Sequence, residues 1–153
     1  MQAIPVLLMV EDNEDDYEAT VRSLKKNHFV NPVHWCRSGR DALDFLGRMG
    51  RYADAGVPTP DLILLDLNMP GIDGRQVLST VKADPKLRHI PVIVLTTSSD
   101  ARDVETCYEI GASTYIQKPV SFEGLTEAVR TMKDYWFGVA LLPNREKAAE
   151  KSA

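Results

Sequence analysis

Residues 62–74, LILLDLNMPGIDG, hold an apolar run that ends in one acidic residue and is followed at once by a turn. The Leu- and Ile-rich run predicts a strand covered on both faces, as in a parallel sheet. Asp66 stands where this strand ends, and the Met-Pro-Gly of residues 69–71 breaks regular structure directly after it. We therefore expect the Asp66 carboxylate to lie on a rigid strand end facing a loop, although an Asp there can also serve only as a turn cap.

The alternation of apolar runs with helical patterns extends over most of the chain. Strands are expected at residues 4–10, 33–36, 62–66, 91–96 and 114–117. Each is followed by a segment with helical periodicity or a helix cap, such as Ser38 before an expected helix over residues 39–49. A Gly-, Pro- and Asp-rich loop over residues 50–60 precedes the third strand. The pattern predicts an α/β fold, a doubly wound five-stranded parallel sheet in three layers.

Length and composition fit one domain with a proper core, since 44% of the 153 residues are apolar and 26% are charged. The net charge of −4 disfavours binding to nucleic acid or to an anionic membrane surface. Cys36 and Cys107 are isolated and the histidines lack metal-ligand spacing, so we expect neither a disulfide framework nor a zinc site. Without an export signal or a membrane-spanning run, the expected location is the cytoplasm.

Polar residues gather where the predicted strands end. In open parallel sheets the working site lies beyond the carboxyl ends of the strands. The residues expected there are Glu11, Asp12, Asp66, Thr96 and Lys118. Carboxylates brought this close repel one another unless a cation lies between them, and oxygen-only ligation favours Mg²⁺.

This set of residues suits phosphoryl chemistry. Asp66 is a candidate nucleophile toward phosphorus, because carboxylates form aspartyl phosphates. Lys118 would supply positive charge, and the Thr96 hydroxyl would donate to a phosphoryl oxygen. No neighbour of Asp66 in the sequence is an evident general base, which indicates slow hydrolysis. Taken singly, each residue also has an ordinary structural explanation, as a cap, a strand-end hydroxyl or a surface lysine.

The order of these residues resembles that of bacterial response regulator receiver domains. The matching motifs are Glu11-Asp12, Asp66 in LDLNMPGIDG, Thr96 in VLTT, Tyr115 in TYIQ, and Lys118-Pro119. The resemblance covers about residues 4–132 and implies a flavodoxin-like fold, with Asp66 accepting a phosphoryl group from a sensor histidine kinase. It also implies Mg²⁺ bound by Asp12, Asp66 and the backbone carbonyl of Asn68, with Glu11 acting through water.

The resemblance further implies a switch, in which Thr96 moves toward the phosphoryl group and Tyr115 fills the vacated space. Tyr115 could equally be a half-buried strand aromatic with its hydroxyl at the surface. One departure from the family is the hydroxyl run Thr97, Ser98 and Ser99, where an apolar residue is more common. With this run present, the resemblance does not fix the rate at which the phosphoryl group is hydrolysed or how accessible that group is.

A narrower resemblance is to the small single-domain regulators that partner bacterial phytochromes. It is carried by the loop over residues 50–60, by DPKLRHIPVIVLTTSS and by the ending YWFGVALLP. It implies a phytochrome kinase as partner and a homodimer built on a cluster of terminal apolar residues. These residues are Tyr135, Trp136, Phe137, Val139, Leu141 and Leu142, which could instead fold back onto the core. We expect a receiver domain over residues 1–137 and a dimer-associated, then flexible, extension over residues 138–153.

Two other functions stay open on the sequence alone. An aspartate-nucleophile phosphatase or phosphotransferase also uses a strand-end Asp with Mg²⁺, but it needs a second acid two residues on, where this chain has Asn68. A flavin- or nucleotide-binding module would need a phosphate-binding first loop, but the acidic residues 11–13 would repel a phosphate. We therefore expect a signalling module that is not a turnover enzyme and that acts through a protein partner.

Overall fold

A single sheet of parallel strands in the order β2-β1-β3-β4-β5 forms the centre of the molecule. The structure is a computed structural model and describes residues 4–143. The strands are β1 (Leu7–Val10), β2 (Val33–Cys36), β3 (Leu62–Leu65), β4 (Val92–Thr96) and β5 (Thr114–Gln117). The helices between and after them are α1 (Glu14–Lys26), α2 (Gly39–Gly47), α3 (Gly74–Ala83), α4 (Ala101–Ile110) and α5 (Phe122–Asp134). The doubly wound, flavodoxin-like α/β fold expected from the sequence is confirmed.

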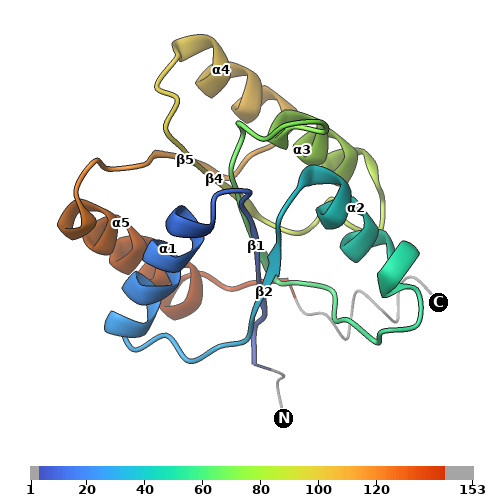
Figure 1. Cartoon of the computed structure of the whole chain (residues 1–153), viewed down its shortest axis with the longest axis horizontal. Helices are drawn as coiled ribbons and strands as arrows, with labels where there is room; N and C mark the ends of the chain where they lie inside the picture. The colour runs from blue at the N-terminus through green and yellow to red at the C-terminus, as the bar shows by residue number, and fades with distance from the viewer. Residues whose placement is uncertain (1–3, 144–153) are drawn as a thin grey trace.

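Helices cover both faces of the sheet, as Figure 1 shows, with α1 and α5 on one side and α2, α3 and α4 on the other. The side chains of each strand alternate between these two layers. In β1, for example, Leu8 and Val10 belong to the core beneath α2 to α4, whereas Leu7 and Met9 belong to the core beneath α1 and α5. Burial on both faces is the physical reason why the strands read as continuous apolar runs.

The helices begin where capping residues allow. The N-caps, whose side chains accept a backbone N–H of the first turn, are Asn13, Ser38, Asp73, Asp100 and Ser121. Asp73 and Gln76 form a full capping box at the start of α3. These caps matter for the site, because α1 and α3 begin directly after the loops that carry the acidic residues.

Two of the expected boundaries differ from the structure by two residues or more. Strand β1 begins at Leu7 rather than at residue 4, because Pro5 has no amide hydrogen and the Val6 amide donates to the Asp61 carboxylate at 2.7 Å. Helix α2 ends at Gly47 rather than near residue 49, because Arg48 adopts a left-handed conformation with φ of 53°.

The long loop over residues 50–60 is partly tied to the body of the protein. It opens with a 3₁₀ turn, η1 (Gly50–Tyr52). The Tyr52 ring packs edge-on against Phe45, and its hydroxyl donates to Asp41 at 3.0 Å. Arg51 also pairs with Asp41 at 2.9 Å. The first part of the loop is therefore anchored to α2.

The aromatic C-terminal segment is divided between core and surface. Helix α5 continues into a π-helical turn, η2 (Tyr135–Val139). Trp136 and Phe137 fold back onto the core, where Phe137 meets Phe29 with ring centroids 4.9 Å apart. Tyr135, Val139 and Leu141 are exposed. The expected division at residue 137 stays a prediction, since residues 144–153 lie outside the described part of the chain.

Within residues 4–143, no helix combines the length and the apolar content that crossing a membrane requires.

Candidate functional site

Asp66 lies directly beyond the end of β3, held by backbone contacts on both sides. Its amide donates to the Val10 carbonyl at 3.0 Å, and the Gly74 amide donates to the Leu67 carbonyl at 2.9 Å. A Cβ atom on Gly74 would lie 2.1 Å from the Asp66 carbonyl oxygen. Glycine at the first position of α3 therefore lets the loop pack tightly behind Asp66. Asp66 itself is only 6% exposed.

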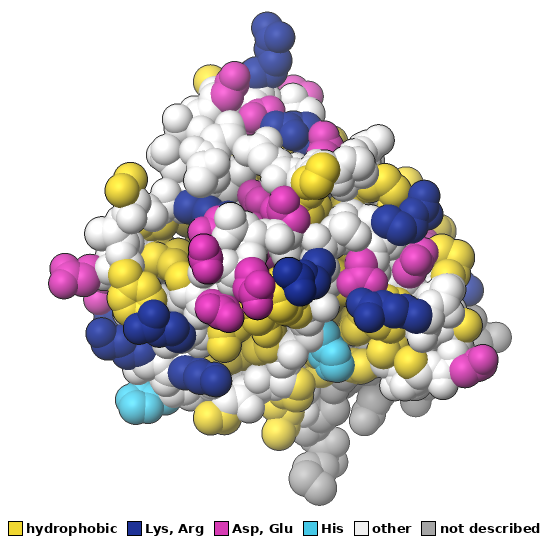
Figure 2. Space-filling model, viewed as in Figure 1, with side chains coloured by type: hydrophobic (Ala, Val, Ile, Leu, Met, Phe, Trp, Pro, Cys, Tyr) yellow, Lys and Arg dark blue, Asp and Glu magenta, His cyan; other side chains and the backbone are white. Residues whose placement is uncertain are grey.

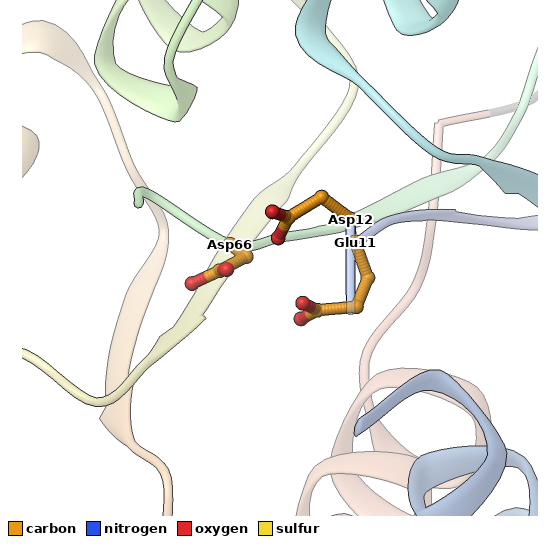
Figure 3. A group of neighbouring side chains, drawn as sticks. All are labelled: Glu11, Asp12 and Asp66. Carbon is orange, nitrogen blue, oxygen red and sulfur yellow. The ribbon is translucent and has the colours of Figure 1, made fainter. Parts of the chain in front are cut away.

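Three carboxyl groups converge beside this loop. Glu11 and Asp12 follow β1, and one oxygen from each lies within 4.8 Å of the others and of an Asp66 oxygen. Figure 3 shows the three side chains reaching into the same space from two adjacent strand ends. Figure 2 shows acidic side chains gathered near the middle of the visible face. The strand-end acids expected from the sequence are thus brought together.

Lys118 is the cation of this group, and it leans toward one side of it. Its Nζ donates to Glu11 Oε2 at 2.8 Å and to Asp16 Oδ2 at 2.9 Å. The nearest Asp66 oxygen is farther away, at 3.8 Å. In this state Lys118 forms an ion pair with Asp66 but is hydrogen-bonded to the other two carboxylates.

Burial and mutual repulsion raise the pKa values of Glu11 and Asp66. Burial raises the pKa of Glu11, with Lys118 opposing the change and Asp66 adding to it. Burial also raises the pKa of Asp66, while Lys118 and the Thr96 hydroxyl favour its charged form. The pKa of Lys118 is raised as well, because its contacts with Glu11 and Asp16 outweigh its own burial. A cation placed among the carboxylates would stabilise the charged forms of Glu11 and Asp66.

The other two side chains expected at the site, Thr96 and Tyr115, lie on β4 and β5. Thr96, at the end of β4, is fully buried, and the Asn68 amide approaches its hydroxyl at 3.5 Å. Tyr115 of β5 is half-buried against the core, and its hydroxyl donates to the Ser98 carbonyl at 2.9 Å. The Tyr115 hydroxyl is therefore held by the loop that follows Thr96.

A polar network fixes that loop from its other side. The Ser98 hydroxyl donates to Asp103 of α4 at 2.7 Å, and Asp103 pairs with Arg75 of α3 at 2.7 Å. Ser98, which belongs to the hydroxyl run after Thr96, is therefore held twice. Its hydroxyl bonds to Asp103, and its carbonyl accepts the Tyr115 hydroxyl.

Asp16 and the pair Arg75–Asp103 were missed by the sequence reasoning. Asp16 lies in the first turn of α1, three residues after its N-cap Asn13, and an acid in the first turn of the helix that follows Glu11-Asp12 was the available signal. Arg75 and Asp103 lie on different helices, and nothing in their local sequence indicates that they meet.

Comparison with known proteins identifies the family. The family model described as Response regulator receiver domain matches residues 7–130. The chain belongs to this family. Receiver domains are phosphoacceptor modules rather than turnover enzymes, and they bind Mg²⁺ at an acidic cluster, which here is Glu11, Asp12 and Asp66.

Several small regulators resemble this receiver domain over nearly their whole length. The probable methanogenesis regulatory protein FilR2 of Methanothrix harundinacea is 39% identical over 87% of this chain and 84% of its own. The response regulator Rcp1 of Synechocystis is 38% identical over 90% of this chain and 92% of its own. Its Mn²⁺-bound form superposes with a TM-score of 0.85, over 91% of this chain and 99% of that one.

The phosphorylated cyanobacterial phytochrome response regulator RcpA has the same fold. It superposes with a TM-score of 0.86 and 37% identity, over 93% of this chain and all of that one. The narrower likeness to phytochrome response regulators, expected from the sequence, is thus confirmed.

Mg²⁺ is expected to stabilise this receiver domain by relieving the repulsion among its acids. At about 100 times its dissociation constant, linkage predicts a gain of about 2.7 kcal/mol in the free energy of unfolding. Asp12→Asn should be more stable without metal and should gain much less on adding it. Urea unfolding with Mg²⁺ or a chelator measures both, and Glu105→Gln, on the exposed face of α4, is the control. An equal gain in Asp12→Asn would contradict a metal site at this cluster.

Proposed function

We propose that Asp66 accepts a phosphoryl group from the phosphohistidine of a sensor histidine kinase. A carboxylate oxygen of Asp66 would form the new P–O bond as the P–N bond breaks, and the departing histidine nitrogen would keep the electron pair. The observation that supports this role is the convergence of Glu11, Asp12, Asp66 and Lys118 at one sheet edge. Positioning and charge neutralisation are what phosphoryl transfer chiefly requires.

Each surrounding group has a proposed task. Glu11, Asp12, Asp66 and Asn68 would hold Mg²⁺, which neutralises charge on the phosphoryl oxygens when bound. Lys118 and Thr96 would contact those oxygens directly. Tyr115 would follow Thr96 and change the surface around α4 and β5, since Tyr115 is already bonded to the loop after Thr96.

The proposed output is a lasting mark rather than turnover. Asn68, two residues after Asp66, has an amide that cannot act as a general base toward water. We therefore propose that autodephosphorylation is slow and that the phosphorylated protein persists long enough to meet its partner in the cytoplasm.

The proposed kinase is a bacterial phytochrome. The support is likeness to Rcp1 and to RcpA, the latter described as a phytochrome response regulator. FilR2, named for methanogenesis, is equally similar, so phosphotransfer from a purified phytochrome kinase is the observation that this partnership needs.

Asp66→Asn is expected to abolish labelling by radioactive acetyl phosphate, because an amide cannot form an acyl phosphate under these conditions. Asp54→Asn, in the exposed loop after α2, is the control and should label as the wild type does. Undiminished labelling of Asp66→Asn would disprove the assignment.

A second copy of the chain is the proposed occupant of the exposed C-terminal surface. Tyr135, Val139 and Leu141 are 51%, 72% and 98% exposed and adjoin the packed Trp136 and Phe137. Apolar side chains so close together are typical of interfaces.

Light scattering should give twice the 17.1 kDa of one chain, and Val139→Glu should shift the mass toward that of the monomer. Val120→Glu places the same charge at a still more exposed valine outside this segment and should leave the mass unchanged. Repeating the measurement with beryllofluoride and Mg²⁺ reports whether occupation of Asp66 changes assembly. A monomeric wild type at all concentrations would overturn the dimer.

A further inference from the structure

Asp16 is the acid next to the site that the family motif does not include. It occupies the first turn of α1, and the contact its carboxylate makes is with Lys118, at 2.9 Å. Its own backbone is held separately, because its amide donates to the Asn13 cap and its carbonyl accepts from Thr20. The side chain can therefore change partners without disturbing the helix.

The contact matters because Lys118 is shared between Asp16 and the other carboxylates of the site. An ammonium group only donates, and it divides its N–H groups among the acceptors around it. Here Glu11 and Asp16 hold the Lys118 Nζ at hydrogen-bond distance, whereas Asp66 Oδ2 lies beyond it at 3.8 Å. Two of the three N–H groups of Lys118 are engaged in this way, and a shift of Nζ toward a phosphoryl oxygen on Asp66 would lengthen a contact on its other side.

The solvent exposure of Glu11 and Asp16 shows which of their two contacts with Lys118 is cheaper to break. The Glu11 side chain is 6% exposed, so losing Lys118 would leave a buried carboxylate without compensation. The Asp16 side chain is 45% exposed, so water can replace the ammonium there at small cost. The contact with Asp16 is therefore the one that costs less to break.

We propose, building on Asp66 as the phosphoacceptor, that Asp16 is a positioning residue that competes with the phosphoryl group for Lys118. Asp16 stabilises the unmodified state by holding the ammonium toward α1. Occupation of Asp66 draws the ammonium across and releases Asp16 to solvent. The carboxylate thereby sets how strongly the site favours the modified state, since a ligand shifts such an equilibrium only by its differential contacts.

Beryllofluoride with Mg²⁺ is the probe, and its apparent dissociation constant is the measurement. Asp16→Asn should bind it about twofold to fivefold more tightly than the wild type, the range expected for a partly exposed ion pair. Asp16→Glu, which keeps the carboxylate within reach, should restore binding close to that of the wild type. Asp15→Asn removes the same charge from the same exposed turn and should have little effect.

Varying the ionic strength distinguishes the effect of a direct Asp16–Lys118 contact from that of a long-range change in charge. At about 1 M salt the screening length falls to about 3 Å, so effects of remote charge fade while a direct contact at 2.9 Å is less affected. The gain in Asp16→Asn should therefore become smaller in high salt without disappearing.

Equal or weaker binding by Asp16→Asn, an equal gain in Asp15→Asn, or loss of the gain in high salt would each overturn the competition. If the wild type itself binds no beryllofluoride, the phosphoacceptor function fails instead, so the two failures are distinguishable.

Discussion

The repulsion among carboxylates at one sheet edge is the constraint on which the site depends. Glu11, Asp12 and Asp66 lie within 4.8 Å of one another, and Lys118 is the ammonium that pairs with two of them. One ammonium cannot balance three acids, so the edge favours a further cation and raises the pKa of the buried members. An acidic site that attracts a cation and places a nucleophile beside it is suited to receiving a phosphoryl group.

The register of the sheet is what imposes this closeness. Val10 pairs with Leu65 across β1 and β3, so the residues that follow each strand emerge side by side. Thr96 pairs with Gln117 across β4 and β5, which brings Lys118 to the same edge. Because the strands are buried on both faces, slipping any of them would carry apolar side chains into the wrong layer. The packing of the core therefore fixes the geometry of the site.

Patterns that depend on neighbouring residues were readable from the sequence, and contacts between distant elements were not. The apolar run before Asp66 predicted both a strand and the position of the acid, and the Ser38 cap was also found. The start of β1 was wrong because a side chain distant in sequence, Asp61, captures the Val6 amide. The sequence left open whether Trp136 and Phe137 form an interface or fold back onto the core, because the contact of Phe137 with Phe29 appears only in three dimensions.

Asp66 as the acceptor is the central claim, and reduction of the acyl phosphate tests it most directly. The wild type is treated with acetyl phosphate and Mg²⁺, reduced with borohydride, which converts an aspartyl phosphate to homoserine, and mapped by peptide mass spectrometry. The account predicts homoserine at position 66 and at no other acid, including the neighbouring Asp12. Homoserine at another position, or none at 66 in a protein that has incorporated phosphate, would contradict it.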